Sequence, residues 1–128
     1  MDFYRSLSEW STENEITVLA TNAFWDYMKS LPENVGEIDY AEDIIEIFSY
    51  IDKSRFSLVP LRLSFSLDLN DPDDTSGAFS YTFDLEYAEM RIGSFTAVFD
   101  PDINLIDEDL EIDDFKLVKK FCKSVKRK

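Results

Sequence analysis

The residue types in this sequence that could do chemistry are carboxylates, and their densest run lies between Asp100 and Glu111. Counted from Asp100, positions 1, 3, 5, 9 and 12 would carry the side-chain oxygen ligands of an EF-hand and position 7 a backbone carbonyl. The residues in these positions are Asp100, Asp102, Asn104, Glu108, Glu111 and, for the carbonyl, Ile106. Leu105 replaces the glycine on which the sharp turn of such a loop depends, and a strand rather than a helix is predicted before it. We therefore predict an acidic loop without physiological calcium binding, and keep a calcium-binding module as an alternative.

Other catalytic and cofactor-binding devices lack the residues that they need. The sequence has no histidine, which removes the usual general base, zinc ligand and activator of a serine or cysteine nucleophile. It has only three glycines, so no phosphate-binding loop or dinucleotide fingerprint can be written. Paired carboxylates of the glycosidase kind remain available, but 27 acidic residues make chance pairs certain. We expect a protein that is not an enzyme and holds no cofactor or metal; an enzyme working with carboxylates alone is a further alternative.

Two consecutive runs alternate apolar and polar residues, which predicts strands with one apolar and one polar face. The apolar positions are Leu61, Leu63, Phe65, Leu67 and Leu69, then Phe79, Tyr81, Phe83, Leu85 and Tyr87. With a tight turn near Ala88 and Glu89, the pattern predicts antiparallel strands over 61–69, 78–87 and 90–99; the alternative is one long strand through Ile92. Pro60 favours a bulge or strand start on an edge strand, and Gly93 a bulge in the third strand.

Apolar residues at helical spacing predict helices over 12–31, 39–51 and 114–126, and a short one over 2–10. Capping boxes at Thr12–Glu15 and Asp39–Glu42 predict the starts of the helices over 12–31 and 39–51. Asp113 or Asp114 is the predicted N-cap of the last helix. The segment 103–112 has no clean period and is predicted to be a loop with room for one helical turn.

The order of these elements predicts an α+β fold: N-terminal helices, an antiparallel meander of three or slightly more strands, and a C-terminal helix packed on one face of the sheet. A chain of 128 residues without a long linker fits a single domain, 1–128. Its last part, 115–128, is a basic terminal helix with an end that can fray.

Acidic residues form two clusters that a meander would bring to the same end of the sheet. They are Asp71, Asp73 and Asp74 in the first hairpin tip, and Asp100, Asp102, Asp107, Glu108, Asp109 and Glu111 after the third strand. Like charges gathered on one rim cost stability through repulsion, which favours a functional explanation. The clusters therefore predict a site that binds a basic protein surface.

Charge is distributed unevenly along the chain, whose net charge is −14. Residues 61–114 contain fifteen acids and two bases, whereas 115–128 contain seven bases and no acid. Seven bases on one helix without interleaved aromatic residues are a small footprint for nucleic acid, and the overall charge repels phosphates. We expect no direct contact with nucleic acid.

Location is predicted from what the sequence lacks. The lone Cys122 falls on the apolar face of a predicted helix, where a reduced, buried thiol is expected. No signal peptide and no run of about 18 apolar residues is found, so we expect a cytoplasmic protein without a membrane partner.

In size, acidity and lack of catalytic residues the chain resembles bacterial toxin immunity proteins. The resemblance implies a cognate toxin domain as partner, often a nuclease with a cationic substrate cleft. A nucleic-acid mimic that regulates a DNA-binding protein would have the same composition and is the alternative.

Overall fold

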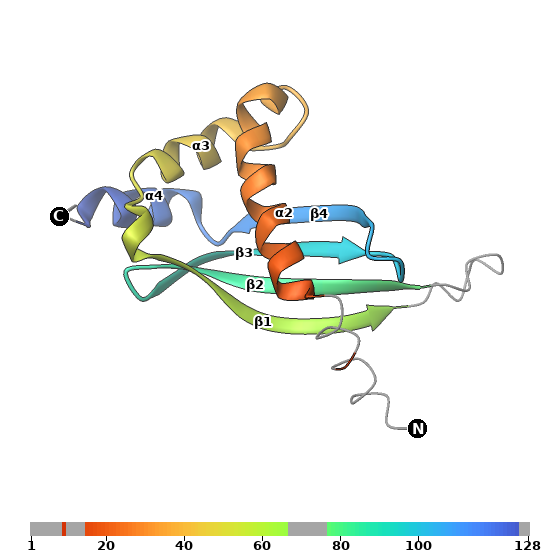
Figure 1. Ribbon diagram of the computed structural model, residues 1–128. Helices are drawn as coiled ribbons and strands as arrows, with labels where there is room; N and C mark the ends of the chain where they lie inside the picture. The colour runs from red at the N-terminus through yellow and green to blue at the C-terminus, as the bar shows by residue number, and fades with distance from the viewer. Residues whose placement is uncertain (1–8, 10–14, 67–76, 126–128) are drawn as a thin grey trace.

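The computed structural model describes residue 9 and residues 15–66 and 77–125, in which helices precede and follow one antiparallel sheet (Figure 1). The elements are α2 (Ile16–Ser30), η1 (Leu31–Asn34), α3 (Ala41–Ser49), η2 (Lys53–Arg55), β1 (Phe56–Ser66), β2 (Ala78–Tyr87), β3 (Met90–Phe99), β4 (Leu105–Ile112) and α4 (Phe115–Ser124). The predicted α+β class and antiparallel meander are confirmed, with four strands in the order β1-β2-β3-β4. The helix predicted over 2–10 lies outside the described residues except for Glu9, which is helical.

The sheet buries one face because its apolar residues alternate with polar ones along the central strands. Phe83, Leu85 and Tyr87 of β2 are almost fully buried and face the helical layer. In Figure 1, α2 crosses this face of the sheet. A hydrogen bond of 2.8 Å between Thr17 Oγ1 and Tyr81 Oη joins α2 to β2. The opposite face of the sheet has none of the described helices on it.

Helix α4 packs at the end of the sheet beside α3. Phe121 meets Tyr87, the last residue of β2, with ring centroids 6.3 Å apart. Val118 and Cys122 complete the buried side of the helix. None of the helices in the described part of the chain is long and apolar enough to cross a membrane.

Turns and bulges fall close to the positions predicted for them. Ala88 and Glu89 both have positive φ, as a two-residue hairpin turn requires, so β2 and β3 are separate strands. Leu85 pairs with Gly93 and Glu86 with Arg91, which leaves an extra residue in β3 next to Gly93. The edge strand β1 likewise shifts register just after Pro60.

The prediction of a loop over 103–112 is wrong, because residues 105–112 form the edge strand β4. Leu110 and Ile112 are buried and alternate with exposed Asp109 and Glu111, but this pattern is too short to stand out in the sequence. The strand forms because β3 supplies a pairing partner, from Gly93 opposite Ile112 to Phe99 opposite Leu105. A strand with a strong acidic face is stabilised here by tertiary pairing rather than by local preference.

Two of the predicted helix starts also differ from the structure. Helix α2 begins at Ile16, after Glu15 in the left-handed region and without a side-chain cap; Thr12 lies outside the described residues. Helix α3 follows Tyr40 rather than Asp39, so the second capping box is wrong. The predicted cap of the last helix is confirmed at Asp114, whose carboxylate accepts a hydrogen bond from Leu117 N at 3.1 Å.

Candidate functional site

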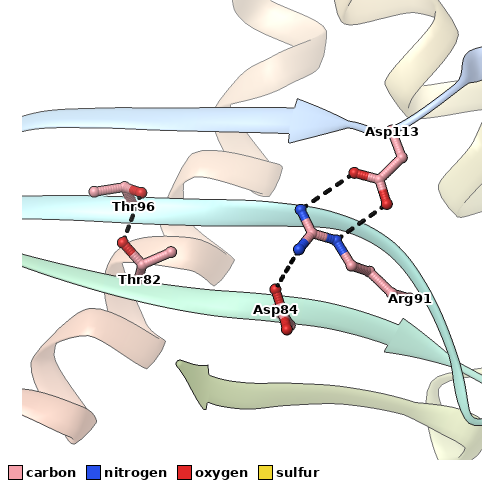
Figure 2. A network of polar contacts seen from close by, with 5 residues as sticks. All are labelled: Thr82, Asp84, Arg91, Thr96 and Asp113. Carbon is pink, nitrogen blue, oxygen red and sulfur yellow. Dashed lines mark hydrogen bonds and ion pairs between the residues drawn. The ribbon is translucent and has the colours of Figure 1, made fainter. Parts of the chain in front are cut away.

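The face of the sheet that none of the described helices covers (Figure 1), called the uncovered face below, is the candidate functional site, and small polar side chains lie at its centre. Strand pairing aligns Arg62, Thr82, Thr96 and Asp109 in one row across β1 to β4. The hydroxyls of Thr82 and Thr96 lie 3.0 Å apart on this face (Figure 2). Thr82 is itself buried, so the part of this row that is open to a partner lies toward the exposed Asp109.

Three of the predicted carboxylates lie together along the edge of this face. Asp107, Asp109 and Glu111 alternate along β4, so their side chains point to the same side at intervals of about 6.8 Å. None of the three has an ion pair with another residue of the described chain. We refer to Asp107, Asp109 and Glu111 as the β4 acid row.

Glu108 is the predicted site residue that the structure separates from its neighbours. It pairs with the buried Ala97 and therefore faces the helical layer, opposite to the β4 acid row. Burial, followed by the charges of Asp107 and Asp26, raises the pKa of its carboxyl. The pKa of Tyr27 is also raised, by burial and then by Glu108 and Asp109. The prediction that Glu108 belongs to the same surface as Asp107 and Asp109 is wrong, because successive residues of a strand alternate faces.

Asp100 and Asp102 belong to the turn between β3 and β4. The Asp100 carboxylate accepts hydrogen bonds from Asp102 N at 2.9 Å, Asn104 N at 2.9 Å and Asn104 Nδ2 at 3.1 Å. The bonds from Asn104 are the main cause of its lowered pKa. Ile103 completes the turn with a positive φ of 62°. Asp100 therefore stabilises the turn, and only Asp102 of this pair is left exposed without that role.

Asp71, Asp73 and Asp74 lie outside the described residues. The strands that flank residues 71–74 are β1 and β2, and Ser66 at the end of β1 pairs with Ala78 at the start of β2. The next residue of β2, Phe79, pairs with Phe99 at the end of β3, just before Asp100 of the other predicted cluster. Both connections, β1 to β2 and β3 to β4, thus leave the sheet at the same end. This relation between strand ends agrees with the predicted meander.

Arg91 holds two acids that the sequence did not single out (Figure 2). Its guanidinium lies 3.0 Å from Asp84 Oδ1 and contacts both oxygens of Asp113 at 3.1 and 3.3 Å. These carboxylates, Asp113 first, raise the pKa of Arg91. Asp84 and Asp113 therefore share one cation, whose pKa the nearby charge of Glu111 also raises, whereas none of the β4 acid row is ion-paired within the described chain. No local pattern indicates the network, because its members come from β2, β3 and the segment after β4.

The basic C-terminal helix is partly engaged within the protein. Lys119 Nζ lies 2.7 Å from Glu46 Oε1 of α3, a contact that raises the pKa of the lysine and lowers that of the glutamate. Lys123 lies over the ring of Tyr50, 5.1 Å from its centroid. These contacts hold α4 against α3.

The arrangement of the predicted calcium ligands does not form an EF-hand loop. Asp100 and Asp102 lie in a turn, and Glu108 and Glu111 lie on opposite faces of a strand. Across the described residues, no group of three or more histidine, cysteine, aspartate or glutamate side chains is placed to hold a metal ion. What the site offers chemically is a row of negative charge along the edge strand of the sheet.

Comparisons of the chain with protein-family models, with curated proteins and with solved structures found no match. Function is therefore inferred from the geometry of this surface.

Proposed function

We propose that this chain is a non-catalytic acidic protein that binds and neutralises a basic protein, most simply as a bacterial toxin immunity protein. The observation that carries the proposal is the β4 acid row, three carboxylates in line on the uncovered face of the sheet without ion pairs in the described chain. A cytoplasmic location, where an immunity protein meets its toxin, belongs to the same proposal.

The energetics of the row favour binding over a purely structural role. Carboxylates about 6.8 Å apart repel one another, and an exposed row adds little to folding stability. Arg91 forms ion pairs with two other acids of this face, Asp84 and Asp113, but with none of these three, although the charge of Glu111 contributes to its raised pKa. A negatively charged strip raises the association rate with a positively charged cleft by roughly 10–10³-fold.

The sheet beside the row suits an inhibitor, because its strands are held by antiparallel pairing. Thr82 is buried and shares a hydrogen bond with the half-buried Thr96, so the centre of this face presents little unpaired polar surface to a partner. If this face docked on a cationic substrate cleft, the rigid sheet would cover the cleft. The carboxylates of the row would attract the positive charges of the cleft. Neutralisation then follows from exclusion of the toxin's anionic substrate.

The partner in the test is the protein encoded by the gene next to the gene for this chain. Association rates are measured over a range of ionic strength. The variant Asp107→Lys/Asp109→Lys reverses two charges of the row. The control Glu33→Lys/Glu89→Lys makes the same change in net charge at exposed positions away from it. We expect association to slow by about tenfold or more at low salt in the first variant only, with the difference shrinking as salt screens the charges.

Rates that are independent of salt and equal in all three proteins, with circular dichroism showing an intact fold, would refute the proposal. A partner that is a DNA-binding protein without toxic activity would instead favour the nucleic-acid mimic, since the same row can occupy a cleft that binds phosphates.

A further inference from the structure

The outer edge of β4 is the more accessible of the two sheet edges. Within the described chain β4 pairs only with β3, so the backbone groups on its other side have no strand partner. The opposite edge strand, β1, has Pro60 and a register shift in its middle, two features that hinder the addition of another strand. In β4 the single register shift lies near its start, and the pairing is regular from Asp107 to Ile112.

A groove of about 540 Å³ runs along this edge. Five consecutive residues, 109–113, line it, and they include both faces of the strand. Because residues of both faces line it, the groove reaches the edge of β4, and Tyr27 and Ile44 of the helical layer lie on its inner side. Its other wall comes from the connection before α3 and from the start of α4, with Ile38 and Phe115 among the lining residues. The described residues that line the groove include no basic side chain.

We infer that an extended segment of the basic partner adds to β4 as a fifth strand. Lysine or arginine at every second position of that segment would lie beside Asp109 and Glu111 on the uncovered face. The intervening residues would lie beside Leu110 and Ile112, on the side of the groove where Ile38 and Phe115 are. Backbone hydrogen bonds would supply affinity and the alternating side chains specificity. The inference rests on the proposed function for the basic nature of the partner.

A second copy of this chain does not fit the same edge. Antiparallel pairing of β4 with another β4 would bring the β4 acid rows of both copies onto one face of the joined sheet, and facing like charges destabilise such a pair. Charge complementarity therefore selects a basic strand as the occupant.

Tyr40 offers an aromatic contact in this groove. The residue is 64 % exposed, although its ring packs on Phe115 with centroids 5.0 Å apart. Tyr40 has a φ of 62°, in the left-handed region that a bulky residue rarely adopts. Backbone strain of this kind concentrates at binding sites, and exposed tyrosine is common where partners dock. An arginine or apolar side chain of the added strand can pack on this ring.

The test uses a synthetic peptide of about eight residues in which lysine alternates with valine, blocked at both ends. Binding is measured by calorimetry, and amide exchange of β4 is followed by NMR. We expect alternate amides of β4, which exchange freely in the free protein, to become protected. The variant Asp109→Lys/Glu111→Lys should bind at least about tenfold more weakly, and Glu33→Lys/Glu89→Lys about as well as the parent.

Two N-methylated peptides separate strand addition from simple charge attraction. Methylation of every second amide on one edge of the peptide blocks its hydrogen bonds to β4, and methylation on the other edge does not. One methylated peptide should therefore lose binding by about tenfold or more while the other retains it. Equal binding of both peptides, or protection of no β4 amide, would overturn the inference.

Failure of the inference is distinct from failure of the proposed function. If the encoded partner binds with the salt dependence and charge-reversal effect described above while the alternating peptide does not bind, strand addition is wrong and the basic partner stands. If the free protein dimerises through β4, the choice of occupant is wrong.

Discussion

Gly93 of β3 lies against the backbone carbonyl oxygen of Glu111 in β4, and a Cβ atom at Gly93 would collide with that oxygen. The next atoms that it would meet, Ile112 Cα and the Glu111 carbonyl carbon, also belong to the β4 backbone. Backbone cannot move aside as the end of a flexible side chain can. Because Gly93 has no side chain, β4 and its acid row can pair with β3.

We predict that Gly93→Ala lowers the free energy of unfolding by about 1–3 kcal/mol, because β4 must shift to admit the methyl group. Urea denaturation measures the change. Gly36→Ala is the matched control, since a Cβ atom there has no neighbour within 4 Å. Equal stabilities of the two variants would contradict the close packing of β3 on β4.

Removal of the Arg91 side chain should leave Asp84 without its cation. The Asp84 side chain is only 19 % exposed, so its charge is poorly solvated. We predict that Arg91→Ala lowers the free energy of unfolding by about 1 kcal/mol. The double variant Arg91→Ala/Asp84→Asn should recover part of this loss, because the amide carries no charge.

Arg62→Ala is the control for Arg91→Ala, since it removes the same charge from an exposed position on the same face. We expect little change in its urea midpoint. A loss as large as that of Arg91→Ala would show that net charge, rather than the network with Asp84 and Asp113, sets the stability.

Glu108 should make stability depend on pH in a defined direction. Its pKa is raised from the usual 4.5, so the folded state binds the proton more tightly than the unfolded chain. This stabilising contribution is present below about pH 4.5 and is lost as pH rises through the raised pKa. Glu108→Gln should therefore exceed the parent in stability at neutral pH, and the difference should disappear in acid.

Urea unfolding at about pH 7 and about pH 3.5 checks this dependence on Glu108. Glu33→Gln, which removes one exposed charge elsewhere, corrects for the general effect of lowering the net charge of −14. A difference between Glu108→Gln and Glu33→Gln that does not vary with pH would refute the assignment.

The sequence by itself determined the elements whose periodicity is local and strong. The predicted bounds of β2 and β3, 78–87 and 90–99, coincide with the structure, because one face of each strand is nearly continuous in buried apolar residues. The apolar faces of helices α2, α3 and α4 were likewise predicted. The starts of α2 and α3 differ from the prediction by a few residues, because Glu15 and Tyr40, just before them, adopt left-handed conformations.

Tertiary structure alone decided what the carboxylates do. β4 exists because β3 pairs with it, since its first residues, Leu105 and Ile106, are exposed and interrupt the alternation. That pairing turns Glu108 toward the helices and places Asp107, Asp109 and Glu111 in one row. Arg91 of β3 forms ion pairs with Asp84 of β2 and with Asp113 after β4. Which carboxylates are ion-paired depends on distances in the folded chain, and the spacing of residues in the sequence does not encode these distances.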